Sequence, residues 1–79
     1  MGNLDTKLIT VTVIEEGDSS ENCLFIYYGD SEYDYLKLLK THAHYTEYLD
    51  ALHVGSTYVI RYDDGDRVID SILNEHNPK

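Results

Sequence analysis

The stretch Lys7-Leu8-Ile9-Thr10-Val11-Thr12-Val13-Ile14-Glu15 decides the fold class, because its side chains alternate with a period of two residues. Ile9, Val11 and Val13 fall on one face, and Thr10, Thr12 and Ile14 fall on the other. This alternation is the pattern of a half-buried β-strand. We therefore predict a strand over Lys7–Glu15, and the neighbouring segments are interpreted around it.

Two hairpins are predicted next to this strand and near the C-terminus. A polar loop, Glu16–Glu21, leads into the apolar run Cys23–Tyr28, which has the length of a second strand. Further along, Thr57–Tyr62 and Arg67–Leu73 alternate in the same way. The segment that joins them, Asp63-Asp64-Gly65-Asp66, contains the Asp-Gly pair that is typical of a tight hairpin turn.

A helix is predicted between the hairpins, over Glu32–Leu52. Bulky side chains recur there at spacings of three and four: Tyr35, Leu38, His42, Tyr45, Leu49 and Leu52. Ser31 and Asp34 approximate a capping box at its start. The weak helix formers of Thr41–His44 leave open whether the helix is continuous, kinked or broken in two. Gly55 is expected to take the left-handed conformation where the segment ends.

The expected fold is therefore α+β: a four-stranded antiparallel sheet in ββαββ order with one helical segment packed on it. The sheet either stays open as a sandwich or curls into a small OB-like barrel. The length predicts one small acidic domain over residues 1–79, with residues 1–6 and 74–79 as frayed ends. A core of this size is only marginally sufficient, so a second copy is a candidate partner.

The charge balance is the main guide to function. Fifteen Asp and Glu residues against six Lys and Arg residues give a net charge of −9. The six cations form no patch, which argues against direct binding of nucleic acid or an anionic membrane. Cys23 is expected to be a small buried hydrophobe in a reducing compartment, and the sequence carries neither a leader pattern nor an apolar span. A cytoplasmic location is expected.

The carboxylates gather at three places that we expect at strand ends and loops, together with tyrosines. Neighbouring positions on strands and helices can present negative charges at intervals comparable to those of a nucleic-acid backbone, and tyrosine rings attract Arg and Lys. We therefore predict a surface that recognises a basic protein. Its expected residues are Tyr28, Asp30, Glu32, Tyr33, Asp34, Asp63, Asp64, Asp66, Glu15, Glu16 and Asp18, with Tyr48 and Tyr62 as further aromatic candidates.

The acidic loops and the tyrosines also have simpler interpretations. Turns favour Asp and Gly, so acidic loops are often only solvated, and each tyrosine ring fits a packed position about as well as an exposed one. Catalysis is not expected, because Cys23 lies in an apolar strand and no phosphate loop or nucleophile elbow is present. No cofactor or metal is expected: the Asp63–Asp70 segment does not follow the EF-hand pattern, and the four histidines, His42, His44, His53 and His76, match no zinc spacing.

Two resemblances accompany this reading. The segment from Leu52 to Ile72, with its Leu-His-Val-Gly turn, resembles the closing hairpin of OB-like barrels. In size, charge and tyrosine content, the whole chain resembles the small acidic inhibitor proteins of bacteriophages that act as DNA mimics. That resemblance implies a binding inhibitor that occupies the DNA-binding site of a host nucleoid protein or defence nuclease, in the host cytoplasm. The alternative is an assembly module of the same fold without charge mimicry.

Overall fold

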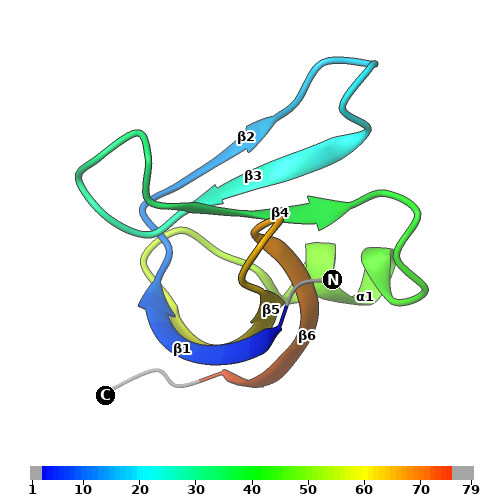
Figure 1. The fold of residues 1–79 in the computed structure, drawn as a ribbon. Helices are drawn as coiled ribbons and strands as arrows, with labels where there is room; N and C mark the ends of the chain where they lie inside the picture. The colour runs from blue at the N-terminus through cyan, green and yellow to red at the C-terminus, as the bar shows by residue number, and fades with distance from the viewer. Residues whose placement is uncertain (1–2, 76–79) are drawn as a thin grey trace.

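The computed structural model describes residues 3–75, which form six strands and one short helix (Figure 1). The elements in chain order are β1 (Leu4–Thr10), β2 (Val13–Glu16), β3 (Cys23–Tyr27), β4 (Tyr35–Leu39), α1 (Tyr45–Ala51), β5 (Thr57–Asp63) and β6 (Val68–Glu75). Residues 4–6 and 74–75, which were expected to fray, are the outer ends of β1 and β6. The remaining positions of the expected frayed ends, 1–2 and 76–79, lie outside the described residues.

All six strands belong to one mixed sheet in the order β1-β5-β6-β4-β3-β2. The pairs are antiparallel except β4 and β6, which run parallel where Lys37 lies beside Val68. The prediction of four antiparallel strands in ββαββ order is therefore wrong. The expected barrel is wrong as well, because the sheet is strongly curved but does not close (Figure 1).

The predicted first strand, Lys7–Glu15, is divided at Val11 and Thr12 into two strands at opposite edges of the sheet. β1 pairs with β5 along seven residues, whereas β2 pairs with β3 along four. Val11 donates its N–H to the carbonyl of Ser56 at 2.9 Å, and Thr12 donates its N–H to the carbonyl of Tyr27 at 2.8 Å. Each residue of this corner thus bonds to a different half of the sheet, and the chain bends between them.

The first half of the predicted helix is the strand β4. Its burial alternates, with Leu36 and Leu38 fully buried and their neighbours half-buried. β4 pairs with β3 along five residues, so that Leu36 lies opposite Ile26. The segment fits both periodicities, and strand pairing prevails because it buries both leucines while satisfying backbone groups along β3. Thr41–His44, which we expected to kink or break the helix, instead connects β4 to α1.

The helical prediction holds only for α1 and the turn after it. α1 contributes no fully buried side chain, although Tyr45 and Tyr48 pack against the core from their half-buried positions. Gly55 has φ 94°, so its expected left-handed conformation is confirmed. It donates its N–H to the carbonyl of Val11 at 2.7 Å, which ties this turn to the corner of the sheet. No helix within residues 3–75 is long and apolar enough to cross a bilayer.

The second predicted hairpin is confirmed as β5 and β6, with irregular pairing at two points. Its loop ends at Arg67, which has φ 59° and donates its N–H to the carbonyl of Asp63 at 2.7 Å. The carbonyl of Arg67 accepts the N–H of Lys37 at 2.7 Å. Arg67 therefore closes the hairpin and also holds it against β4.

One apolar core lies on the inner side of the curved sheet. Its buried members are Ile9, Val11, Leu24, Ile26, Leu36, Leu38, Leu52, Tyr58, Ile60, Tyr62 and Ile69. Cys23 is also buried, as predicted, and burial raises the pKa of its thiol. Tyr58 is the largest fully buried side chain, and its hydroxyl donates to the carbonyl of Ala51 at 2.6 Å while accepting the N–H of His53 at 2.8 Å. This hydroxyl fastens the end of α1 to the core.

We expect Tyr58→Phe to lower the free energy of unfolding by about 1–3 kcal/mol, because two partly buried backbone groups lose their partner. Urea denaturation followed by circular dichroism measures the change. Tyr33→Phe is the matched control, since the side chain of Tyr33 is 69% exposed. Equal stability of the two variants would contradict the role of the Tyr58 hydroxyl.

We expect Gly55→Ala to destabilise the fold by about 1–2 kcal/mol, because an L-residue is strained in the left-handed region. A Cβ would meet no atom within 4 Å at this position, so the backbone conformation alone is tested. Val54→Ala, at the exposed neighbouring position, should change stability by less than about 0.5 kcal/mol. Thermal melts of the two variants provide the comparison.

Candidate functional site

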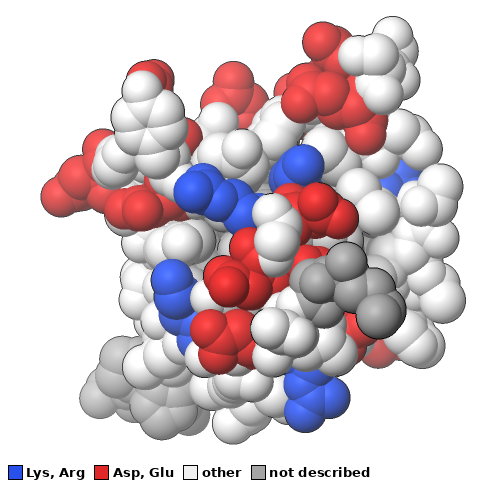
Figure 2. Space-filling model, in the orientation of Figure 1, with Lys and Arg blue, Asp and Glu red and all other residues white. Residues whose placement is uncertain are grey.

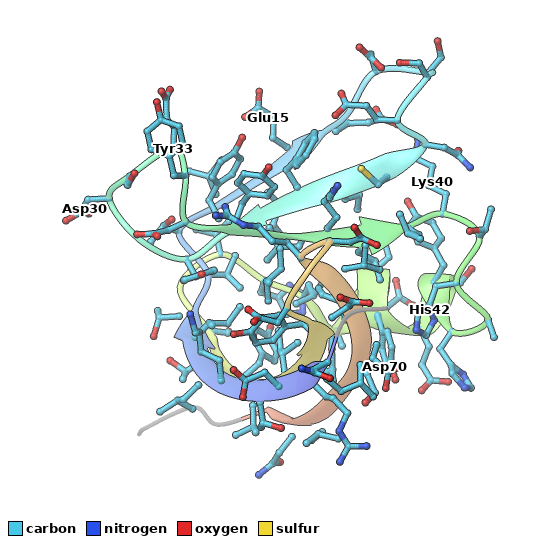
Figure 3. The ribbon with its side chains drawn as sticks, viewed as in Figure 1. Glu15, Asp30, Tyr33, Lys40, His42 and Asp70 are labelled. Carbon is cyan, nitrogen blue, oxygen red and sulfur yellow. The ribbon has the colours of Figure 1, made fainter. Side chains whose placement is uncertain are left out.

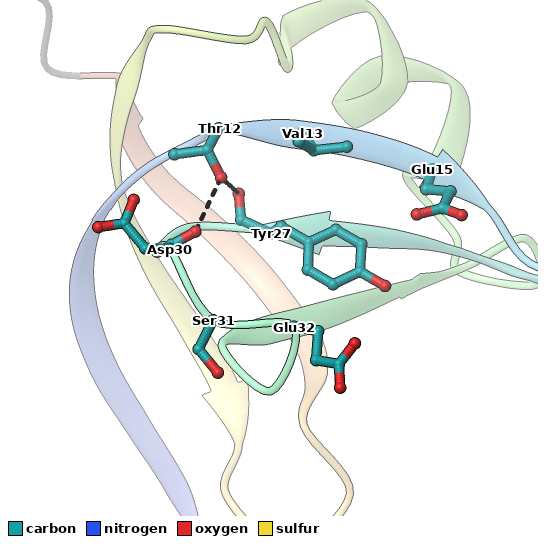
Figure 4. Close-up of a pocket in the computed structure, with 8 residues that line it drawn as sticks. Thr12, Val13, Glu15, Tyr27, Asp30, Ser31 and Glu32 are labelled. Carbon is teal, nitrogen blue, oxygen red and sulfur yellow. Dashed lines mark hydrogen bonds between the residues drawn. The ribbon is translucent and has the colours of Figure 1, made fainter.

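A groove of about 430 Å³ lies on the surface next to the corner of the sheet (Figure 4). Two segments that are distant in the sequence line it: one runs along the start of β2, and the other runs from the end of β3 into the following loop. The lining residues are Thr12, Val13, Glu15, Tyr27, Gly29, Asp30, Ser31 and Glu32. The groove therefore brings together carboxylates from two of the three predicted acidic clusters.

The loop that forms one wall of the groove is held by local contacts. Tyr28 donates its N–H to the carbonyl of Asp34 at 3.0 Å. Gly29 lies beneath this closure, and a Cβ there would lie 2.6 Å from the carboxylate of Asp34, so a larger residue would displace the Asp34 side chain. The hydroxyl of Ser31 accepts the N–H of Tyr33 at 3.1 Å, so the expected helix cap serves a turn instead. These contacts fix the direction in which Asp30 and Glu32 are presented.

Thr12 joins the two walls of the groove. Its hydroxyl lies 3.2 Å from the carbonyl of Tyr27 and 3.3 Å from the carbonyl of Gly29, and it can donate to either (Figure 4). The ring of Tyr27 lies between the side chains of Glu15 and Glu32 (Figure 4). Partial desolvation, followed by these nearby negative charges, raises the pKa of the Tyr27 phenol. The surroundings of this ring therefore favour positive charge.

Another hollow, of about 280 Å³, gathers four tyrosines, Tyr28, Tyr33, Tyr35 and Tyr62, together with two cations of the chain itself, Lys7 and Arg67. Lys7 Nζ lies 5.0 Å from the ring centre of Tyr28 and 3.3 Å from its hydroxyl, and this hydrogen bond raises the pKa of Lys7. The guanidinium of Arg67 lies 5.0 Å from the ring centre of Tyr35 and donates to the carbonyl of Tyr33. Tyr28 and Tyr35 thus contact cations of the chain itself, Lys7 and Arg67, as the predicted attraction between tyrosine rings and cations would favour.

The structure separates the predicted aromatic candidates. Tyr33 is exposed, whereas Tyr28 is half-buried against Lys7. Tyr48 is half-buried beside His42 and His44, with ring centres 5.2 and 5.8 Å away. Tyr62 is 6% exposed and belongs to the core, so its assignment as a contact residue is wrong. Tyr33 is therefore the one freely presented ring among these four.

The acidic candidates also divide into two groups. Four carboxylates have structural neighbours: Glu16 lies 2.5 Å from Lys40, Asp18 binds its own loop, Asp63 accepts the N–H groups of Gly65 and Asp66, and Asp34 packs against Gly29. Within residues 3–75, no ion pair or hydrogen bond engages the side chains of Glu15, Asp30, Glu32, Asp64 and Asp66. Figure 2 shows acidic groups at the top, left and centre of one face, with Lys and Arg between them.

Five residues that line the groove were not predicted as contacts: Thr12, Val13, Tyr27, Gly29 and Ser31. Tyr27 was expected to pack, yet its ring lies on the outer face of the sheet because Leu24 and Ile26 turn inward. Applying the two-residue period to Cys23–Tyr28 would have found this ring. Thr12 and Val13 carry no such signal, since their place depends on the corner between β1 and β2.

The histidine and acidic side chains of residues 3–75 form no metal-binding group. His42 Nε2 lies 2.6 Å from the carbonyl of Asp70, and its Nδ1 accepts the N–H of His44 at 2.9 Å, so both nitrogens hold the turn before α1 (Figure 3). Among the residues from 3 to 75, no three Cys, His, Asp or Glu side chains are grouped as metal ligands. His76 lies outside the described residues.

We expect Ser20→Ala to raise the pKa of Asp18 towards its usual value. The Ser20 hydroxyl, 2.6 Å from Asp18 Oδ1, is the main cause that lowers this pKa, and backbone N–H groups add to it. Because the folded-state pKa is lowered, the stabilisation is present above the unfolded-state pKa and is lost as the pH falls through the folded-state pKa. Ser20→Ala should therefore destabilise the chain more at pH 7 than in acid. NMR titration of the Asp18 carboxyl carbon measures the shift, with Ser31→Ala as the control that should leave it unchanged.

Comparison with known proteins adds no assignment to this geometry: no protein-family model, no curated protein and no solved structure matches the chain.

Proposed function

We propose that the chain is a protein-binding inhibitor that places its acidic face on the nucleic-acid-binding surface of a basic protein. The observation that carries this proposal is the convergence of Glu15, Asp30 and Glu32 around one groove, where none of the three forms an ion pair within residues 3–75. A surface that served only hydration would need no such grouping. A partner that carries Lys and Arg for phosphate contacts offers the complementary charge.

The net charge of −9 supports the same proposal through kinetics. Long-range attraction accelerates the association of oppositely charged proteins, and salt screens this attraction over about 8–10 Å at physiological ionic strength. An inhibitor of this kind competes with nucleic acid for the same cations. The proposed target is therefore a class of protein, a basic DNA-binding protein such as a nucleoid protein or a defence nuclease.

The second candidate is an assembly module that uses an open sheet edge. β1 is an edge strand, and it exposes Leu4 at 56% and Leu8 at 60% on its outer face. An unpaired strand with apolar side chains can accept a strand from another chain. Binding by this route would depend little on salt, which separates it from the proposed inhibitor.

The test is competition for a basic target. The immobilised chain is exposed to a bacterial lysate at low salt, bound proteins are eluted with a salt gradient, and each captured protein is purified. We expect at least one DNA-binding protein whose complex with labelled DNA is displaced by the chain, with an affinity that falls as salt rises. Capture that ignores both DNA and salt would contradict the proposal.

Charge-neutral variants locate the surface. At about 0.5 kcal/mol for each exposed charge, the combined variant Glu15→Gln, Asp30→Asn and Glu32→Gln should bind the purified target roughly tenfold more weakly. The control removes three charges elsewhere, through Asp5→Asn, Glu47→Gln and Asp50→Asn. Equal weakening by both variants would mean that only net charge matters and that the groove is not the contact.

A further inference from the structure

The outer face of the strands β2, β3 and β4 carries a cluster of three half-buried aromatic rings. Phe25 and Tyr35 meet edge to face with ring centres 5.4 Å apart, and Tyr27 lies 5.8 Å from Tyr35 and 6.4 Å from Phe25. The side chain of Val13, 48% exposed, lies on β2 opposite Tyr27 in the sheet register. The cluster forms a firm platform beside the groove, because its rings support one another.

The chain already places cations on its tyrosine rings. Arg67 lies over Tyr35 at 5.0 Å, and Lys7 lies over Tyr28 at 5.0 Å and over Tyr62 at 5.7 Å. The ring of Tyr27, next to Tyr35, has no such cation among the described residues. Arg67 therefore shows that a guanidinium can lie over a ring of this cluster, and Tyr27 is the ring next to Tyr35.

The carboxylates around Tyr27 add charge complementarity to the ring. Glu15 on β2 and Glu32 in the loop lie on either side of it (Figure 4). A guanidinium is planar and has five N–H donors, so it can stack on a ring face and still bond carboxylates at its rim. An ammonium group has three donors and no planar face to stack on a ring, so it matches this arrangement less well. The arrangement therefore suits arginine better than lysine.

We propose that this face binds an arginine side chain of the partner, with the guanidinium over the ring of Tyr27 and between the carboxylates of Glu15 and Glu32. This inference deepens the proposed function, since it names the group on the basic partner that the groove recognises. The groove volume of about 430 Å³ gives room for a long side chain together with part of the backbone that carries it.

The test uses short peptides, so that it does not depend on finding the target. The ¹⁵N-labelled chain is titrated at low salt with the blocked peptide acetyl-Gly-Ser-Arg-Ser-Gly-amide, and with the same peptide carrying lysine or uncharged citrulline at its centre. We expect the arginine peptide to shift the amide signals of residues 13–15, 27 and 30–32. Citrulline should cause no shifts there, and lysine should cause weaker ones. Equal effects of the three peptides, or shifts centred on α1, would overturn the inference.

Variants distinguish the contribution of the Tyr27 ring to arginine binding from that of the carboxylates of Glu15 and Glu32. Tyr27→Leu should weaken arginine binding by roughly fivefold or more, while Tyr27→Phe should retain most of it, since the ring face supplies the attraction. Tyr33→Leu, at an exposed ring outside the groove, should leave binding unchanged. Glu15→Gln with Glu32→Gln should weaken binding more than Glu47→Gln with Asp50→Asn. Should Tyr27→Leu fail to fold, the paired glutamate variants decide the question by themselves.

The two proposals fail in different ways. If the chain displaces DNA from a basic protein but the arginine peptide leaves residues 13–15, 27 and 30–32 unshifted, the arginine site is wrong and the inhibitor stands. If the arginine peptide binds at these residues but no captured protein is displaced from DNA, the site stands and the proposed function is wrong.

Discussion

The change of hydrogen-bonding partner at Val11 and Thr12 is the constraint on which the rest of the structure depends. Val11 is 1% exposed, donates its N–H to Ser56 and accepts the N–H of Gly55, whereas Thr12 bonds to Tyr27. One extended segment thereby supplies both edges of the sheet. Because Val11 bonds to the turn before β5 while Thr12 bonds to β3, the sheet has to curve, and its inner side becomes the enclosed core.

The groove is a consequence of the same corner. Thr12 ties the start of β2 to the carbonyls of Tyr27 and Gly29. Glu15 on β2 therefore lies beside the loop after β3 that contains Asp30 and Glu32. Three of the chain's Lys and Arg side chains make contacts within the molecule. Lys7 and Arg67 lie over tyrosine rings in the hollow of about 280 Å³, Lys40 pairs with Glu16, and no ion pair within residues 3–75 engages the carboxylates of the groove.

The sequence predicted that the candidate site is acidic, but it did not show which residues come together to form it. The acidic residues Glu15, Asp30 and Glu32 are visible in the sequence as charged positions near turns. Their meeting at one groove is not visible, because it requires β2 to lie against β3 with a known register. Tyr62 illustrates the opposite error: its phenol suggested a contact, yet its position on β5 turns it into the core. A polar hydroxyl does not reveal which face of a strand a tyrosine occupies.

The sequence by itself determined β3, from its apolar run of strand length, and β5 and β6, from their alternating side chains, together with the left-handed Gly55 and the burial of Cys23. These features depend on local sterics and on a two-residue period, which neighbouring residues suffice to define. Only the tertiary structure decided that Tyr35–Leu39 is a strand, that Lys7–Glu15 divides at Val11, and that β4 runs parallel to β6. In each case two local conformations were comparably favourable, and the choice depended on which of them buries apolar side chains and satisfies the backbone against distant partners.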